Sequence, residues 1–490
     1  MPDPLIVTLD VGSSSVRTLL FDSSARQLPG LGVQLPYRIA TTQDGGVEVD
    51  GEELARLAIE ALSNLHDHMQ TAGLRPAAVC CSAFWHSFLG VGSDGRPTTP
   101  IIHLFDTRSA GQVEQLKKQL DPTATHARTG CVLHTSYWPA KLLWLAATRQ
   151  EAFAATRRWL SFGEYLYEQV CGRPALSSSM ASGSGIWNQN ANDYDQETLA
   201  VLPVRREQLY PRNELDQAPD RLRSEFGANW PLFDDIPWYP AVGDGACNNI
   251  GSGCITRERF SLMVGTSGAM RAVLEEDRVE IPQGVWCYRV DARRFVLGGA
   301  VSNGGEVFAW MRRTLSLPGP EQIEHEISAM EPGAHGLTIV PLFAGERSPN
   351  WRGSARAAFS GMNLDTTPME ITRAALEAVA LTFRQIYQIM AARLGDPAEV
   401  AASGGALAHS AAWTQMMADA LQRPVHFCVE PEASSRGAAL LALERLGAIA
   451  HIQDLPAQMG RVFQPREETR AAYDRMFAKM VDLYDKTSGG

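Results

Sequence analysis

The stretch that decides the fold is Leu5-Ile-Val-Thr-Leu-Asp-Val-Gly-Ser-Ser-Ser-Val-Arg-Thr-Leu-Leu-Phe21. Its aliphatic and β-branched residues predict a strand up to Asp10 and a second strand over residues 16–21. Gly12 and the serines that follow it predict a tight turn between them. The stretch therefore predicts a β-hairpin whose first strand ends on a carboxylate.

The same pattern returns in the second half of the chain. Residues 260–264 predict a strand, residues 265–268 a small-residue turn, and residues 269–274 a second strand. This similarity indicates that one α/β unit is duplicated. Met263 stands where the first hairpin has Asp10, so only the first hairpin offers a carboxylate.

The length and the order of the elements predict two α/β domains. A chain of 490 residues exceeds the roughly 100–200 residues of one typical domain. Helix-like stretches at 51–70 and 141–149 alternate with a strand-like stretch at 77–82, and strand, turn and helix follow each other over 400–421. A polar, proline-containing region precedes the second hairpin, so we expect domains at 1–245 and 246–490.

The composition is that of a globular, acidic protein. Hydrophobic residues make up 45% of the chain, enough to bury a large core. The 44 basic and 55 acidic residues give a formal net charge of −11, and this field repels DNA and anionic membranes. We therefore expect no nucleic acid and no membrane as a partner, and an anionic substrate requires local cations.

The chain is expected to be cytoplasmic. Its N-terminus has no secretion signal, and no stretch is long and apolar enough to predict a membrane span. The eight cysteines form no CxxC pair, a pattern typical of reduced thiols and not of a zinc site. The oligomeric state is left open, with a homodimer as one option.

The first hairpin has the residues of a phosphate and magnesium site. Asp10 offers a carboxylate at the strand end, and Arg17 adds a positive charge. The backbone N–H groups and hydroxyls of Gly12, Ser13 and Ser14 can face phosphate oxygens. An ordinary Gly/Ser turn without a ligand accounts for the same residues equally well.

Two glycine-rich turns of the second half are candidates for nucleotide binding: Gly265-Thr266-Ser267-Gly268 and Gly404-Gly405-Ala406. The first repeats the phosphate turn without its carboxylate. The second allows a flat adenine or ribose to approach the backbone closely. Tight turns and close packing of a helix on a strand explain these glycines without any ligand.

Asp244 is the candidate general base. It stands between Gly243 and Gly245, just before the second hairpin begins, where we expect a flexible, exposed carboxylate at the junction of the two domains. An Asp between glycines is more commonly a helix cap or a turn residue.

A hydroxyl-binding pocket is predicted after two successive strands. Trp85-His86-Ser87 follow the first of these strands, and Asp106 and Arg108 follow the second. Side chains at neighbouring strand ends can bind several hydroxyls of a small molecule. The alternatives are a core histidine and a surface ion pair.

Taken in order, these motifs resemble the FGGY family of carbohydrate kinases over residues 5–449. The resemblance implies two ribonuclease-H-like domains of the actin, Hsp70 and hexokinase type with the active site in the cleft between them. It implies ATP and magnesium, with Asp10 at the magnesium–phosphate site. Asp244 would be the base that deprotonates the acceptor hydroxyl, and would also contact the metal. Four segments should form the nucleotide side: residues 265–268, Gly298-Gly299 with Asn303-Gly304-Gly305, residues 341–349, and residues 404–406.

Within this family the chain is most similar to gluconokinases, through His86-Ser87 and residues 264–269 and 298–305. The resemblance implies phosphorylation of a terminal hydroxyl of gluconate. For the carboxylate of gluconate, the charge argument offers His86, Arg108 and Lys141 as cations. Tyr137 is a further candidate for substrate contact.

The sequence also departs from its relatives. Leu104-Phe105 stand before Asp106 where a Trp is frequent, Thr107 replaces a common Asn, and residues 136–138 are unusual before Lys141. A xylulose, ribulose or other polyol kinase therefore stays open. A sugar-sensing regulator that transfers nothing is a further alternative, although Asp10 and Asp244 together argue against it.

Overall fold

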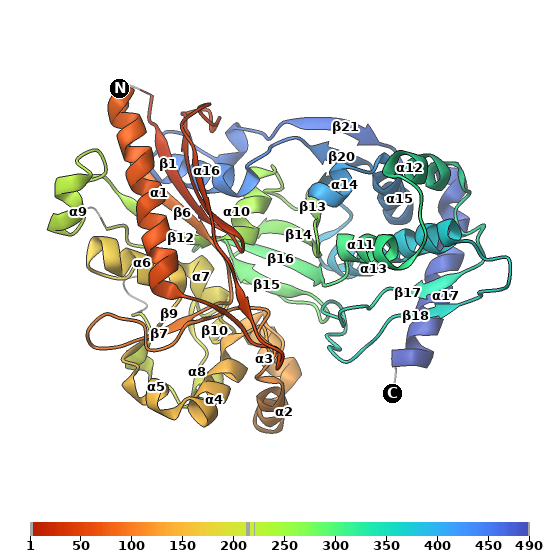
Figure 1. The fold of residues 1–490 in the computed structure, drawn as a ribbon, viewed down its shortest axis with the longest axis horizontal. Coiled ribbons are helices and arrows are strands. Elements are labelled where there is room, and N and C mark those ends of the chain that lie inside the picture. Colours follow the sequence, from red (N-terminus) through yellow and green to blue (C-terminus); the bar gives the residue numbers. More distant parts are fainter. Residues whose placement is uncertain (1–2, 212–215, 220, 489–490) are drawn as a thin grey trace.

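The computed structural model describes residues 3–211, 216–219 and 221–488, and its two halves are each built on a β-sheet covered by helices (Figure 1). The first sheet has the order β12 (Trp238–Gly243), β6 (Ala78–Ala83), β1 (Ile6–Val11), β2 (Ser15–Phe21), β3 (Val33–Pro36). The second has the order β15 (Trp286–Arg289), β16 (Arg294–Val301), β14 (Gly268–Glu275), β13 (Arg259–Val264), β19 (Glu399–Ser403), β20 (Val425–Cys428), β21 (Met459–Phe463).

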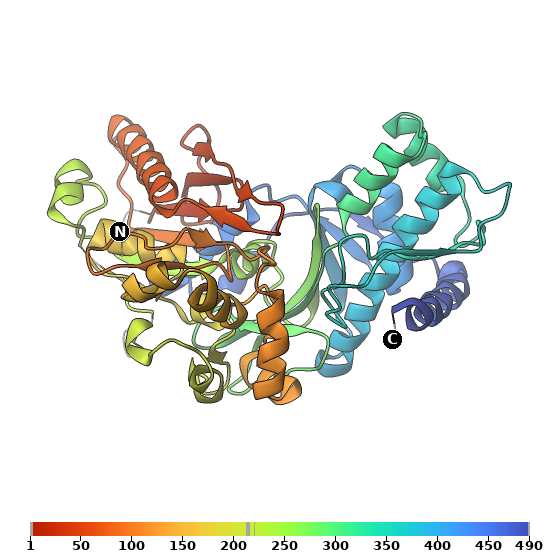
Figure 2. The same cartoon turned by 60° about the horizontal axis from the view of Figure 1, so that its bottom comes forward.

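The two sheets contain the same five-strand unit. In the first, β1 pairs antiparallel with β2 and parallel with β6, while β3 and β12 extend the two sides. In the second, β13 pairs antiparallel with β14 and parallel with β19, while β16 and β20 extend the two sides. The predicted duplication and the two-domain α/β fold are therefore confirmed, and Figure 2 shows the two lobes side by side.

The remaining elements cover these sheets. The helices of the first half are α1 (Gly51–Thr71), α2 (Ala110–Gln119), α3 (Pro122–Thr129), α4 (Trp138–Thr148), α5 (Gln150–Ala155), α6 (Phe162–Cys171), α7 (Ser178–Ser182), α8 (Gln196–Ala200), α9 (Ser224–Asn229) and α10 (Asp244–Gly251). Those of the second half are α11 (Gly305–Thr314), α12 (Pro320–Ala329), α13 (Pro368–Leu394), α14 (Gly405–Ala408), α15 (Ala411–Leu421), α16 (Ala433–Arg445) and α17 (Arg470–Ser488). A small three-stranded sheet is formed by β4 (Ala40–Thr41), β5 (Val47–Val49) and β8 (Ile101–Ile102). Two-stranded sheets are formed by β7 (Leu89–Val91) with β9 (Arg158–Leu160), β10 (Trp187–Asn188) with β11 (Asp193–Tyr194), and β17 (Thr338–Val340) with β18 (Ala358–Ser360).

Parallel strands bring the candidate residues to one edge of each sheet. Asp10 on β1 is in register with Ser82 on β6, and Gly243 on β12 is in register with Ala83. Segments that leave the carboxyl ends of neighbouring parallel strands start side by side. In the second sheet Met263 pairs with Ser403 in the same way, so the turns that follow β13 and β19 also meet.

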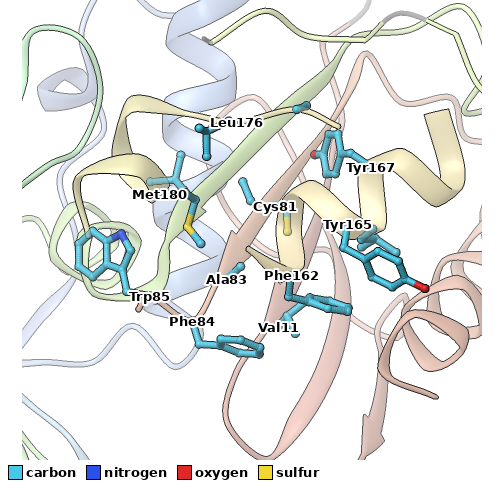
Figure 3. Packing of buried hydrophobic residues seen from close by; sticks show 14 of the residues in the cluster. Val11, Cys81, Ala83, Phe84, Trp85, Phe162, Tyr165, Tyr167, Leu176 and Met180 are labelled. Atoms are coloured by element: carbon cyan, nitrogen blue, oxygen red, sulfur yellow. The ribbon is translucent and has the colours of Figure 1, made fainter. Parts of the chain in front are cut away.

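Aromatic packing holds the first sheet against α6 and α7. Phe162 of α6 stacks on Phe84, with ring centroids 6.0 Å apart, and Figure 3 shows this pair beside Ala83 at the end of β6. Met180 of α7 lies beside the same strand end, near Trp85 (Figure 3). This packing rigidly supports the segment that leads into the candidate site.

The start of α6 contains a buried carboxyl group. The Ser161 hydroxyl accepts from the Glu164 N–H, and the Glu164 carboxylate accepts from the Ser161 N–H at 2.8 Å, which together form a capping box. Burial raises the pKa of Glu164 to about 7. The buried carboxyl group is therefore largely protonated below neutral pH.

We expect Glu164→Gln to flatten the pH dependence of stability. Because the folded pKa of Glu164 lies above the unfolded value, its contribution to stability is complete below about pH 4.5 and is lost as the pH rises through about 7. Gln keeps an acceptor for the Ser161 N–H and carries no charge. From pH 5 to pH 8 the wild-type melting temperature should fall a few degrees more than that of the variant, as thermal unfolding would measure; parallel curves would contradict this assignment.

Helix α16 belongs to the core of the first lobe, although it lies late in the sequence. Residues 438–443 of α16 are buried in the same hydrophobic cluster as β1 and β6. α16 crosses α10 at two glycines: a Cβ on Gly251 would lie 1.8 Å from the Ala433 oxygen, and one on Gly437 would lie 1.9 Å from the Cys247 oxygen. The backbones of the two helices are therefore in direct contact. The expected domain boundary between residues 245 and 246 falls inside α10, and that division stays a prediction.

Within residues 3–211, 216–219 and 221–488, no helix has the length and apolarity that a membrane crossing requires.

Candidate active site

Asp10 lies at the end of β1 as predicted, in a largely buried position. Its side chain is 8% exposed. Burial raises its pKa to about 6, the negative charge of Asp244 adds to this, and Ser82 and Arg17 oppose it. Two carboxylates, one from each of two strand ends, are therefore close enough to repel each other.

Asp244 is the first residue of α10, directly after β12. The expectation of a flexible, exposed carboxylate is wrong, because Asp244 is half-buried and held at the start of a helix. Its carboxylate accepts from the Gly245 N–H at 2.8 Å. Burial raises its pKa, and the positive charge of Arg271 is the largest opposing effect. A raised pKa makes this carboxylate a better proton acceptor than an exposed one.

Trp85 fixes the position of Asp244. A Cβ on Gly243 would lie 1.8 Å from the Trp85 ring, and one on Gly245 would lie 2.9 Å from it. The indole Nε1 donates to the Ser179 oxygen at 3.0 Å, so a hydrogen bond holds the ring in place as well. Glycine is therefore required on both sides of Asp244 because the ring of Trp85 packs there.

The two carboxylates fit a magnesium ion that is also bound by nucleotide phosphates. The described residues contain no group of three or more His, Cys, Asp or Glu placed to hold a metal. Mg²⁺ commonly binds through one or two carboxylates together with substrate phosphates. The mutual repulsion of Asp10 and Asp244, which would be relieved by a cation, matches that mode.

The phosphate turns have open space at their glycines. A Cβ on Gly12 would meet no atom closer than 3.8 Å, and one on Gly265 none closer than 3.9 Å. Ser13, Ser14 and Thr266 are exposed, while Ser267 is half-buried. Both turns therefore present backbone that a phosphate can approach.

Other predicted nucleotide residues support the second turn. The Gly304 N–H donates to the Thr266 oxygen at 3.2 Å, and the Gly305 N–H donates to the Gly265 oxygen at 2.7 Å. The Asn303 side chain donates to the Gly345 oxygen and accepts from the Ala344 N–H, both at 2.8 Å. Direct contact of Asn303 and Gly304 with a nucleotide stays a prediction.

The third glycine turn lies beside the second. Gly404 has φ +95° and packs so closely on β13 that a Cβ would lie 2.4 Å from the Val264 oxygen. Gly405 has open space, and a Cβ on Gly305 would lie 3.2 Å from the Cβ of Ala406. The turns after β13 and β19 thus form one continuous surface.

Arg17 connects the first hairpin to α16. Its Nη1 donates to the Glu432 carboxylate at 2.8 Å, at the N-terminal end of α16. Its positive charge lowers the pKa of Asp10. A contact of Arg17 with phosphate stays a prediction.

Aromatic residues of both lobes surround His86. The Tyr137 hydroxyl lies 2.6 Å from that of Tyr288 on β15. The His86 ring lies 5.2 Å from the Tyr137 ring and 5.1 Å from the Tyr288 ring, between centroids. The predicted pocket residues Trp85, His86 and Tyr137 are thus brought together, and Tyr288 joins them from the second lobe.

His86 is uncharged at neutral pH, so the expectation that it supplies a cation is wrong. Burial lowers its pKa to about 3, and Arg347 and Lys141 lower it further. Its Nδ1 lies 2.6 Å from the Gly183 oxygen, which can only accept, so Nδ1 carries the proton. Nε2 therefore keeps a lone pair that can accept from a hydroxyl.

The other two residues expected to supply cations, Arg108 and Lys141, are both held by contacts with neighbouring protein groups. Arg108 pairs with Asp106 at 2.6 Å and with Glu48 at 2.5 Å, and its guanidinium lies 4.3 Å from the Trp144 ring. Asp106 also accepts from the Val47 N–H at 2.9 Å. These contacts show a buried structural cluster, and substrate contact by Asp106 and Arg108 stays a prediction.

Lys141 is fully buried and donates to the His103 oxygen at 2.6 Å and the Ser136 oxygen at 3.3 Å. Burial lowers its pKa to about 7, so it is only partly charged at neutral pH. Ser87 is also buried, and its hydroxyl accepts from the Leu104 N–H at 3.2 Å. Lys141 and Ser87 thus hold the loop at residues 103–104 by hydrogen bonds. Their contact with a substrate stays a prediction.

The sequence interpretation missed the cations that the structure places beside Asp244. Arg271, on β14, acts electrostatically on Asp244, and Arg347, in the loop after β17, acts on Arg271 and His86. The presence of a single Arg inside the apolar strand 269–274 was a sequence signal that could have identified Arg271 as a candidate site residue. Arg347 stands in the motif 341–349, which was assigned to the nucleotide side.

Comparisons with known proteins agree with this arrangement. Family models for the N-terminal and C-terminal domains of the FGGY family of carbohydrate kinases match residues 5–251 and 260–444. A gluconokinase from Bacillus subtilis strain 168 is 25% identical, with 97% of this chain and 94% of that protein covered. A solved gluconate kinase from Lactobacillus acidophilus superposes with a TM-score of 0.91 at 26% identity, covering 99% of this chain and 98% of that one.

A solved ligand-bound xylulose kinase, also from Lactobacillus acidophilus, matches with the same TM-score of 0.91, 26% identity and the same coverage of 99% and 98%. The duplicated sheet unit, the carboxylates at two neighbouring strand ends and the paired glycine turns therefore occur in a chain that both family models cover. From these matches the chain belongs to the FGGY family of carbohydrate kinases.

Proposed function

We propose that this kinase transfers the γ-phosphoryl group of ATP to a terminal hydroxyl of gluconate. The observation that carries the proposal is the position of Asp244, half-buried at the start of α10 and close enough to Asp10 to raise its pKa. Phosphoryl transfer depends mainly on positioning and on neutralising charge. One carboxylate that accepts a proton beside another that attracts a cation meets both requirements.

In this proposal Asp244 accepts the proton of the acceptor hydroxyl, and the neutral His86 accepts a hydrogen bond from another hydroxyl. The turns at 12–14 and 265–267 hold the phosphates by their backbone N–H groups. Magnesium, when bound, would neutralise phosphate charge during transfer. The glycine turn at 404–406 offers space for adenine or ribose.

Gluconate is the preferred acceptor because the chain matches a gluconokinase and a gluconate kinase over nearly its whole length. Xylulose is the second candidate, since the solved xylulose kinase matches equally well. The aromatic and neutral character of the His86 surroundings suits hydroxyl groups of either compound.

A substrate panel tests the proposal. The purified protein is incubated with ATP, Mg²⁺ and gluconate, xylulose, ribulose or glycerol, while ADP release is followed. We expect the highest kcat/KM with gluconate and an activity at least about 1,000-fold lower in Asp244→Asn. A higher value with a ketose would replace gluconate as the substrate. No stimulation by any acceptor, together with sugar-dependent thermal shifts, would favour a sensor.

Replacing His86 by Asn should weaken acceptor binding selectively. His86 has φ +67°, which Asn tolerates better than most residues, and the Asn side chain can still donate to the Gly183 oxygen. The variant lacks the Nε2 acceptor, so KM for the acceptor should rise about 10-fold, as the loss of one hydrogen bond predicts. Steady-state kinetics should show an unchanged KM for ATP; equal changes in both constants would refute the assigned role.

A further inference from the structure

Two arginine side chains near Asp244 are incompletely partnered. The Nε and Nη1 atoms of Arg271 are buried without a hydrogen-bond partner among the described residues. The Nε of Arg347 is likewise buried, and it has no hydrogen-bond partner in the part of the chain that the structure describes. Buried polar atoms are usually hydrogen-bonded, so each such exception requires an explanation. A ligand that carries acceptor oxygens would provide it.

The surroundings of Arg271 leave room for its side chain. A Cβ on Gly298, the residue opposite Arg271 in β16, would lie 3.0 Å from the Arg271 Cγ. A Cβ on Gly245 would lie 3.4 Å from the Arg271 Nε. The Nε therefore lies next to the residue that follows the proposed base, at the acceptor end of the site.

The charges at this place are unbalanced. Asp244 attracts Arg271, whereas the like charge of Arg347 repels it and lowers the pKa of Arg271, as burial does. The histidines on which Arg347 acts, His86 and His134, are both neutral at physiological pH, because burial lowers the pKa of each to about 3. A second negative charge, supplied by a ligand, would balance the cluster.

We propose that Arg271, together with Arg347, binds the carboxylate of a sugar-acid acceptor, and that Arg271 selects sugar acids over neutral sugars. This inference rests on the proposed function and names the chemical class of its acceptor. The guanidinium fork matches the two oxygens of a carboxylate, which favours two parallel hydrogen bonds.

The position of the pair favours the acceptor over the nucleotide. Arg347 acts on His86 and Tyr137, which belong to the hydroxyl pocket, and on the nearby His134. Its guanidinium also lies 5.9 Å from the ring of Trp351, which packs on His134. The phosphate turns, in contrast, are the loops at 12–14 and 265–267, where Ser13, Ser14 and Thr266 are exposed. The anion that would pair with the two arginines therefore belongs to the acceptor bound in the hydroxyl pocket, and not to the nucleotide.

The test compares acceptors that differ only in the carboxylate. For wild type, Arg271→Met and Arg271→Lys, kcat/KM is measured with gluconate and with glucitol, its neutral counterpart. We expect Arg271→Met to lower the gluconate-to-glucitol ratio about 100-fold, and Arg271→Lys to restore part of it because the charge is retained. Arg278→Met, at an exposed position soon after β14, is the matched control and should leave the ratio unchanged.

The outcomes separate this inference from the proposed substrate. If the ratio is unchanged in Arg271→Met, or if KM for ATP rises instead, the carboxylate assignment is wrong even when gluconate is the substrate. If wild type prefers another aldonic acid and Arg271→Met abolishes that preference, gluconate is wrong and the assignment stands. If wild type uses neutral sugars and ignores all acids, both are overturned.

Discussion

Replacing Asp244 by Asn is expected to lower kcat at least about 1,000-fold without unfolding the protein. The general base would be lost, and positioned bases contribute roughly 10²–10⁴-fold to rates. The Asn oxygen can still accept from the Gly245 N–H, so the start of α10 should keep its geometry. Single-turnover and steady-state rates with saturating ATP and acceptor would measure the loss.

The stability of the same variant provides the control. Burial raises the pKa of Asp244, which means that its charge is destabilising in the folded protein. The melting temperature of Asp244→Asn should therefore equal or exceed that of wild type, and nucleotide binding should persist. A variant that folds and keeps activity within 10-fold of wild type would show that another group is the base.

Replacing Gly437 by Ala should destabilise the protein by about 3 kcal/mol, as overpacking against a rigid neighbour does. The new methyl group would lie 1.9 Å from the backbone oxygen of Cys247, so α10 and α16 would have to separate. In a helix without such a contact, Gly to Ala is stabilising by up to about 1 kcal/mol. The sign of the effect thus reports on the contact.

Urea unfolding would measure this change, with Gly111→Ala as the matched control. Gly111 lies in α2, and a Cβ there would meet no atom within 4 Å. The control should be neutral or slightly stabilising. Since α10 begins at Asp244, the destabilised variant should also lose activity below its unfolding midpoint. Equal stability of the two variants would mean that the helices separate at little cost.

Local patterns predicted the scaffold well because the chain repeats them. The hairpin around Asp10 and its counterpart at 260–274 appear as β1–β2 and β13–β14, and the helices expected at 51–70 and 141–149 correspond to α1 and α4. Alternation of apolar residues and small-residue turns depends on neighbours in sequence. The pairing of the two hairpins into equal sheets follows from that repetition.

The burial of the site residues could not be predicted from the sequence. Asp244 seemed exposed between two glycines, yet those glycines make room for the ring of Trp85. His86 seemed a cation, yet its burial among aromatic rings keeps it neutral. Each of these outcomes depends on contacts between residues far apart in the chain, and such contacts decide both the charge and the accessibility of a side chain.

The same limitation explains why Arg271 was not predicted as a site residue. In the sequence it stands out as a single Arg in an apolar strand, but the sequence does not show which groups it faces. Only the register of β14 with β16 places Gly298 opposite it, and only the approach of α10 places Gly245 and Asp244 beside it. The position of Arg271 beside Asp244 could therefore be recognised only from the arrangement of the two lobes.

The location of α16 also has a consequence for biosynthesis. Arg436 donates to the Gly251 oxygen at 2.8 Å, although the two residues are 185 positions apart in the chain. At about 5–20 residues per second, the ribosome needs roughly 10–40 s to synthesise the segment between them. During that interval the first sheet lacks the helix that covers part of it, so its apolar face is exposed to chaperones. The first lobe is therefore completed after most of the second lobe has been translated.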